Sequence, residues 1–475
     1  MQHDSPITYK QLLAALAERD ALVVRLMERI EQLEAENAQL KAKVARLQKN
    51  SSNSSKPPSS DIVKPPKHKL KGGKKRKIGG QPGHPKHERP WMKPDALEQH
   101  TLDACPNCGG ELDLIEESDR VIQQAELVAQ PIQITEHRAA SYRCTCCGKP
   151  CVAQLPATVA QGGLLGSQLT AMVGYMKGAC HCSYTTIQSY LGQVLGLEVS
   201  TGMLTKAVMK VSASLEAPHE QLCAALPDQP YVKVDETGHK DNGRLHWTWA
   251  FCAEWFTVFK VAPSRGSDVL QTMLSEAFEG VLSCDYFSAY RKYMGDFDVT
   301  VQFCLAHLIR EVKFLTEHPN PQLNAYGQRV LETLAEMFRI FHEYDPSTGA
   351  RFTNALKRAR DRVILAAGCD VPAIKEAENL AHRFEKHGQA YFTFITTPGV
   401  EPTNNLAEQA IRFVVIDRKV TQGTRGPAGQ RWCERIWTTL ATCAKQGRNA
   451  YPFLIEAVES HFHSRLAPSL LPAGP

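Results

Sequence analysis

Two short β-rich runs decide the fold, and each ends in an aspartate: Tyr231-Val-Lys-Val-Asp235 and Val281-Leu-Ser-Cys-Asp285. After the first run, Asp241-Asn242-Gly243 is a strong signal for a tight hairpin turn. Further strands are predicted at about 245–251, 255–261 and 300–304, and helices at 267–278 and from 305 to about 316. The predicted order is three antiparallel strands, helix, strand, helix, strand, helix. This order is typical of a ribonuclease-H-like core, an α/β fold with a mixed five-stranded sheet.

Asp235 and Asp285 would lie close together at the ends of neighbouring strands. Two unpaired carboxylates repel each other, and one of them tends to bind a proton. A divalent cation removes this repulsion, and Mg²⁺ or Mn²⁺ suits oxygen ligands. A pair of such ions supports phosphoryl transfer, which indicates a third carboxylate ligand.

A candidate third carboxylate lies far downstream, at Glu408. Asn404, Glu408 and Arg412 have the i, i+4, i+8 spacing that places them on one helix face. We expect Glu408 to bind metal and its two neighbours to contact DNA. On spacing alone a surface Glu–Arg pair is the simpler interpretation, and Glu401 and Glu434 are competing candidates.

Composition excludes several classes of protein. The 475 residues suggest about three domains, with 43% hydrophobic and 22% charged residues, as in ordinary globular chains. No apolar run is long enough to span a bilayer and the first residues have no apolar signal core, so we expect a cytoplasmic protein without a membrane partner. The odd count of 15 cysteines favours reduced or metal-bound thiols over a disulfide framework.

The first 49 residues have the heptad pattern of a leucine zipper. The a positions are Leu16, Val23, Ile30, Asn37 and Val44, and the d positions are Arg19, Leu26, Leu33, Leu40 and Leu47. β-Branched residues at a with Leu at d favour a parallel dimer, and a single Asn at a fixes the register. The alternative is one amphipathic helix that packs on its own domain.

A basic, Ser-, Pro- and Gly-rich segment follows. Between Lys49 and Lys93 there are 13 Lys and Arg against two acidic residues, so this segment carries +11 and the rest of the chain −6. Such a composition predicts a disordered arm with a polyanionic partner, here DNA, although a solvated tether is the alternative. The residues most expected to contact DNA are Lys71, Lys74, Lys75, Arg76 and Lys77.

Six cysteines gather between positions 105 and 151. Two Cys-x-x-Cys turns supply the four thiolates of a structural Zn²⁺ site. The predicted ligands are Cys105, Cys108, Cys144 and Cys147, with Cys146 as a competitor and Cys151 as a spare. The alternative is a set of reduced core thiols.

Two further motifs have weaker signals. Residues 160–225 are predicted to be helical, and Ser200 is a credible N-cap of the second helix in a helix-turn-helix-like pair. Cys304-x-x-His307 resembles half a zinc site, and His307 could alternatively reach a DNA phosphate. An i, i+3 pair at a helix start is more often structural, so we assign neither role.

Taken together, these motifs resemble the insertion-sequence-66 family of bacterial transposases, of the large-subunit type. The resemblance runs through Gly79–His84, the cysteine module, Val234–Thr237, Asp285 with Tyr290, Cys304-x-x-His307-x-x-Arg310, Asn404–Glu408 and Arg418-Lys419. It implies that Asp235, Asp285 and Glu408 are the catalytic Asp-Asp-Glu triad of a DNA transposase. Tyr286 and Gln409 depart from the usual pattern, and the tail of Gln422–Gly426 with Trp432–Arg435 resembles a divergent branch, which leaves the need for small accessory proteins open.

The predicted function is therefore metal-dependent cleavage of the 3′ ends of an insertion sequence, followed by strand transfer. The alternatives are a non-enzymatic DNA-binding regulator and a ribonuclease-H-like nuclease. The predicted divisions are 1–49 zipper, 50–99 linker, 100–155 zinc module, 160–225 helical region, 226–316 first part of the core, 317–395 helical insertion, 396–425 Glu helix and 426–475 C-terminal helices.

Overall fold

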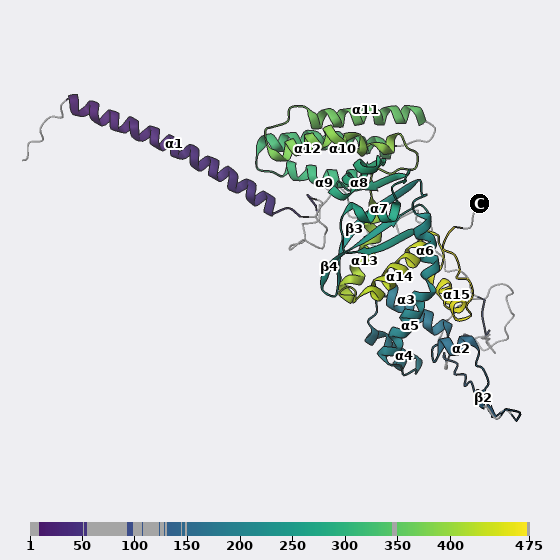
Figure 1. Ribbon diagram of the computed structural model, residues 1–475. Helices are drawn as coiled ribbons and strands as arrows, with labels where there is room; N and C mark the ends of the chain where they lie inside the picture. The colour runs from purple at the N-terminus through teal and green to yellow at the C-terminus, as the bar shows by residue number, and fades with distance from the viewer. Residues whose placement is uncertain are drawn as a thin grey trace, which may run out of the picture.

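The computed structural model describes residues 9–50, 52–54, 93–97, 107, 123, 128, 131–143, 145–147, 150–343 and 349–472. Its N-terminal helix α1 (Tyr9–Leu47) extends away from the rest of the chain (Figure 1). Its C-terminal end meets the body, where Arg46 Nε donates to Glu376 Oε1 at 2.8 Å, and Lys49, just after the helix, lies 3.9 Å from the Phe314 ring centroid. The predicted basic arm, with Lys71, Lys74, Lys75, Arg76 and Lys77, falls outside the described residues.

A small hairpin and a set of helices come next. Strands β1 (Ser141–Arg143) and β2 (Pro150–Val152) pair antiparallel. They are followed by α2 (Ala157–Gly162), α3 (Ser167–Gly178), α4 (Tyr184–Leu195), α5 (Thr201–Ser214) and α6 (Glu216–Ala225). Ser200 caps α5 as predicted, because its hydroxyl accepts from the Met203 N–H at 3.2 Å.

The centre of the protein is a five-stranded mixed sheet, which confirms the predicted sheet. Its strands are β3 (Tyr231–Asp241), β4 (Arg244–Cys252), β5 (Thr257–Ala262), β6 (Val281–Cys284) and β7 (Val301–Phe303). The spatial order is β5-β4-β3-β6-β7, with β3, β4 and β5 antiparallel and β6 and β7 parallel to β3. Asn242 and Gly243 take φ of 48° and 77°, as the predicted tight turn between β3 and β4 requires.

Helices separate the later strands and form a layer beyond them. The helices beside β6 and β7 are α7 (Ser267–Leu274), α8 (Ser288–Phe297) and α9 (Leu305–Thr316). The following residues form α10 (Pro321–His342), α11 (Gly349–Gly368), α12 (Lys375–His387), η3 (Gly388–Tyr391) and η4 (Thr393–Ile395). Figure 1 shows α10, α11 and α12 together at one end of the body.

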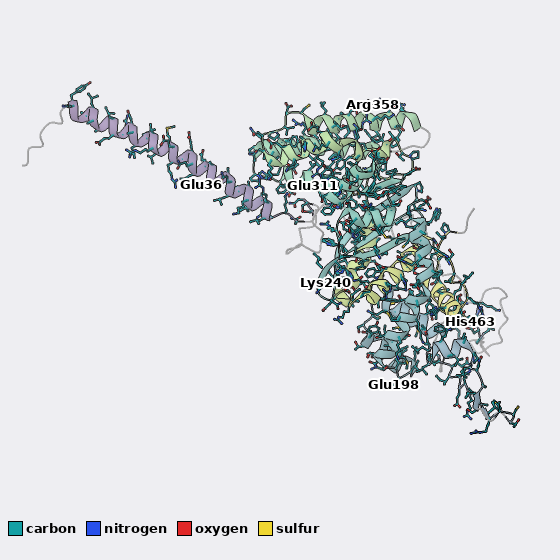
Figure 2. The ribbon with its side chains drawn as sticks, viewed as in Figure 1. Glu36, Glu198, Lys240, Glu311, Arg358 and His463 are labelled. Atoms are coloured by element: carbon teal, nitrogen blue, oxygen red, sulfur yellow. The ribbon has the colours of Figure 1, made fainter. Side chains whose placement is uncertain are left out.

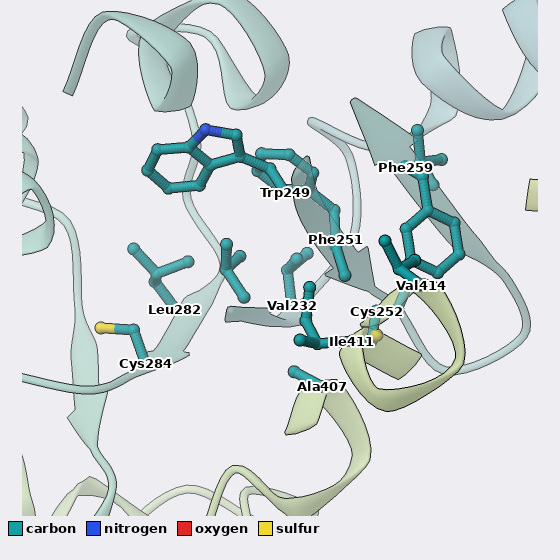
Figure 3. Packing of buried hydrophobic residues seen from close by; sticks show 14 of the residues in the cluster. Val232, Trp249, Phe251, Cys252, Phe259, Leu282, Cys284, Ala407, Ile411 and Val414 are labelled. Atoms are coloured by element: carbon teal, nitrogen blue, oxygen red, sulfur yellow. The ribbon is translucent and has the colours of Figure 1, made fainter. Parts of the chain in front are cut away.

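The chain then returns to the sheet through α13 (Asn405–Thr421), α14 (Pro427–Lys445) and α15 (Ala450–Phe462). Ala407, Ile411 and Val414 form the buried face of α13. Figure 3 shows these side chains beside Val232 and Phe251 of the sheet. Burial of this apolar face fixes where the rest of α13 lies. No helix of the described residues has the length and apolar character that crossing a bilayer would require.

Candidate active site

The two predicted aspartates lie at the same edge of the sheet. Strand β6 pairs in parallel with Tyr231–Lys233 of β3, so Asp235 lies just past the paired segment and Asp285 directly follows β6. Both side chains accept local backbone bonds: Asp235 from the Glu236 N–H at 2.9 Å and Asp285 from the Phe287 N–H at 2.8 Å. These bonds orient the two carboxylates without neutralising them.

The electrostatics of this edge suit a cation. Burial raises the pKa of Asp235 well above its usual range, and the charges of Glu236, Asp285 and Glu408 raise it further. Burial and the charge of Glu236 raise the pKa of Asp285 to about 7. Neighbouring carboxylates repel each other, and a hard divalent ion removes this repulsion. Such a group of carboxylate oxygens is therefore a fitting ligand set for the ion.

Glu408 reaches this edge because of how α13 begins. The Asn404 side chain donates to the Val234 carbonyl oxygen at 2.8 Å, and the Asn404 backbone N–H donates to Cys304 Sγ at 3.2 Å. The first contact holds the start of α13 against β3, and the second holds it against the residue between β7 and α9, one helical turn before Glu408. Asn404 is only 1% exposed, which fits a positioning role better than the predicted contact with DNA. Arg412, one turn after Glu408, is exposed.

Glu408 itself faces helix α9. Arg310 Nη2 donates to Glu408 Oε1 at 2.7 Å, and His307 Nε2 lies 3.7 Å from the same oxygen. Among the described residues, Cys304, His307 and Glu408 form a group whose ligand atoms lie within 4.8 Å of one another, and Asp235 and Asp285 lie outside it. The negative charge of Glu408 nevertheless raises the pKa of Asp235. The contact between α9 and Glu408 was not predicted, although the i, i+3, i+6 spacing of Cys304, His307 and Arg310 places all three on one helix face.

The Cys304 thiol already accepts hydrogen bonds from backbone N–H groups, including that of Asn404 at 3.2 Å. It is 1% exposed, and burial raises its pKa. His307 Nδ1 is buried without a hydrogen-bond partner, and burial together with Arg310 lowers the pKa of His307. The Arg310 guanidinium, which pairs with Glu408 at 2.7 Å, already supplies a positive charge to this group.

A second buried carboxylate, Glu236, was not singled out by the sequence analysis. Arg265 donates to Glu236 Oε1 from Nε at 2.9 Å and from Nη2 at 2.7 Å, and the Tyr290 hydroxyl donates to Oε2. The Arg265 guanidinium also lies 3.8 Å from the Phe287 ring centroid and 4.5 Å from that of Trp247. Glu236 therefore has its partners within the protein, whereas Asp235 and Asp285 make no ion pair among the described residues.

The cysteine module is described only in part. Cys105, Cys108 and Cys144 fall outside the described residues. Cys146 and Cys147 lie exposed in the turn between β1 and β2, and Cys151 pairs with Tyr142 across this hairpin. Of the predicted Cys144-x-x-Cys147 turn, the structure therefore describes Cys147, between the two strands of the hairpin.

Comparison with known families agrees with this geometry. Residues 162–431, more than half of the chain, match the model of the transposase IS66 family. The chain belongs to the IS66 family of transposases. In this IS66-family protein, residues 103–148 also match the zinc-finger binding domain of transposase IS66, and residues 9–90 match a family of unknown function (DUF6444). The zinc-finger match includes all four predicted ligands and Cys146, and it supports a structural zinc.

One curated relative is the uncharacterized protein y4qI of Sinorhizobium fredii (strain NBRC 101917 / NGR234). It is 23% identical over 338 residues, which are 64% of this chain and 61% of the relative. The matched part therefore spans less than two thirds of that protein, and its printed name carries no activity.

Proposed function

We propose that this IS66-family protein is a DNA transposase with a ribonuclease-H-like core and an Asp235–Asp285–Glu408 triad. The observation that supports the proposal is electrostatic: the charges of Asp285 on β6 and Glu408 on α13 both raise the pKa of Asp235 on β3, and the pKa of Asp285 is raised as well. The three carboxylates would hold Mg²⁺ or Mn²⁺ ions, which supply Lewis-acid activation of the attacking oxygen and neutralise charge on the leaving oxygen.

The reaction has two phosphoryl-transfer steps. Water first hydrolyses the phosphodiester at the element end: a new P–O bond forms to the water oxygen, the bond to the 3′ oxygen breaks, and that oxygen leaves as a 3′-OH. The 3′-OH then attacks a target phosphodiester, so one P–O bond forms as another breaks. Exposed Arg412, next to Glu408 on α13, is placed to bind a phosphate of the DNA.

The remaining parts of the chain extend this proposal. Large apolar side chains on α1, such as Leu26 and Leu33, are 53% and 47% exposed, which supports pairing of two copies through a parallel coiled coil. Cys105, Cys108, Cys144 and Cys147 would hold the zinc, and the arm with Lys74–Lys77 would bind DNA phosphates. Small accessory proteins are a further partner class that the family resemblance suggests.

The test uses purified protein and a labelled duplex carrying the DNA that flanks this gene. Wild type is expected to nick and join this DNA in Mg²⁺, whereas Glu408→Gln binds it without chemistry. Glu456→Gln, which removes the charge of an exposed glutamate on α15, is the matched control and should remain active. Nicking without joining would replace the proposal with a nuclease, and binding without chemistry in wild type would replace it with a regulator.

A further inference from the structure

A basic surface lies at the end of the sheet where the β3–β4 hairpin meets the loop between α13 and α14. We name it the hairpin basic surface. Its members are Lys240, Arg244, Arg418, Lys419, Arg425 and Arg431. Figure 2 labels Lys240 at this end of the molecule. None of these residues belongs to the proposed triad, so the role of the surface needs a separate explanation.

The loop is held firmly against the hairpin. The Thr424 N–H donates to the Lys240 carbonyl oxygen at 2.8 Å, and the Asn242 N–H donates to the Thr424 carbonyl oxygen at 3.0 Å. Gly423 has φ of 98°, and a Cβ there would lie 2.1 Å from the Lys240 carbonyl oxygen, so only glycine fits this close approach. The cations of the hairpin and of the loop are thus parts of one fixed surface.

The positive charge of this surface is not neutralised locally. Segments 236–247 and 412–431 contain three acidic residues, and Glu236, Asp241 and Asp417 are only 9%, 7% and 5% exposed. Asp241 turns inward, where it accepts from the Thr424 hydroxyl and the Gly426 N–H, each at 2.7 Å. Arg418 is half-buried beside the Thr237 hydroxyl at 3.2 Å, and the other five cations are exposed. Within the described residues, none of the six makes an ion pair.

The surface continues from the candidate active site. Glu408, Arg412 and Lys419 lie on one face of α13, since steps of four and seven residues each return to nearly the same side of a helix. Along β3, Lys240 lies five residues beyond Asp235, which is about 17 Å at about 3.3 Å per residue. A row of cations at this distance matches the backbone of a duplex about five base pairs from the reacting phosphate, at about 3.4 Å per base pair.

We propose that the hairpin basic surface binds the phosphate backbone of duplex DNA beside the cleaved bond. The proposal rests on the proposed transposase function, because it supplies the substrate class of the same site. Exposed Lys and Arg without acidic neighbours bind DNA by releasing counterions, which makes the affinity strongly dependent on salt. The surface would thus anchor the DNA flank that the triad itself does not hold.

The test compares two triple variants of the full-length protein. Lys240→Gln/Lys419→Gln/Arg425→Gln removes three exposed charges from the surface, and Arg351→Gln/Lys357→Gln/Arg358→Gln removes three exposed charges from α11 as the matched control. Binding to a labelled 60-base-pair duplex of mixed sequence is measured without divalent metal between about 50 and 300 mM NaCl. The surface variant is expected to lose about two to three from the slope of log K against log salt, and roughly 100-fold or more in affinity near 0.1 M salt. The control should keep the wild-type slope.

The outcomes separate this inference from the proposed function. An unchanged slope in the surface variant overturns the inference even if wild type nicks and joins DNA. A reduced slope in the surface variant, together with a wild type that performs no chemistry, supports DNA binding at this surface and overturns the transposase proposal. Wild type that does not bind the duplex at 50 mM salt overturns both. Equal losses in both triple variants also overturn the inference, because they indicate a non-specific effect of net charge.

Discussion

The contact between Arg265 and Glu236 offers a sharp test of how the protein supports its candidate active site. The Glu236 side chain is 2% exposed and accepts two N–H bonds from Arg265, at 2.9 Å and 2.7 Å. Arg265→Ala leaves the carboxylate buried with only the Tyr290 hydroxyl as a partner. Loss of one member of a buried pair costs about 3–5 kcal/mol, and the 37% exposure of the Arg265 side chain lowers this figure to about 2–3 kcal/mol.

The assay is thermal unfolding followed by tryptophan fluorescence. A loss of about 2–3 kcal/mol corresponds to roughly 4–8 °C in Tm for a domain of about 200 residues. Lys292→Ala is the matched control, because Lys292 pairs with Asp296 at the same 2.7 Å while both side chains are exposed, and it should change Tm by less than about 2 °C. Glu236→Gln added to Arg265→Ala should recover part of the loss, since a neutral amide is cheaper to bury than a carboxylate. If the Tm of Arg265→Ala lies within 1 °C of the Tm of Lys292→Ala, the reasoning is refuted.

Three further predictions concern zinc, pH and packing. Cys105→Ser should lower the zinc content measured by elemental analysis, and an unchanged content would contradict the ligand assignment. Burial lowers the pKa of His219 to about 4, so the unfolded chain binds the extra proton first and stability should fall as pH drops from about 6.5 to 4; the fall in Tm over this window should be smaller in His219→Gln, and an equal fall would exclude His219 as its source. A Cβ at Gly178 would lie 2.4 Å from Ile436 Cγ1, so Gly178→Ala should cost about 1–3 kcal/mol in urea unfolding. Added to Ile436→Ala, it should cost much less, and additive losses would show that the clash is relieved elsewhere.

The sheet and the aspartate pair could be predicted because their signals are local. Asp235 and Asp285 each end a short apolar run, and the parallel pairing of Tyr231–Lys233 with β6 places the two residues side by side, although β3 itself continues to Asp241. The turn at Asn242 and the cap at Ser200 likewise depend on residues only a few positions apart. Such features follow from backbone sterics and hydrogen bonding within one segment.

The surroundings of the triad depend on contacts between distant segments. Arg310 and Glu408 are 98 positions apart, and Cys304 and Asn404 are 100 positions apart. Spacing along α13 placed Asn404 on the face of Glu408, but packing buried it against Val234. A periodic pattern identifies which residues share a helix face, whereas the neighbour of that face is set by tertiary packing.

The central claim is that three carboxylates hold the metal ions of the reaction, and exchange of one ligand tests it most directly. Asp285→Cys replaces an oxygen ligand with sulfur, which binds Mg²⁺ poorly and accepts softer ions such as Mn²⁺. Nicking of the flanking-DNA duplex should disappear in Mg²⁺ and return in Mn²⁺ for Asp285→Cys, and it should stay absent in both metals for Asp285→Ala. Nicking by Asp285→Ala in Mg²⁺ at the wild-type rate would contradict the account.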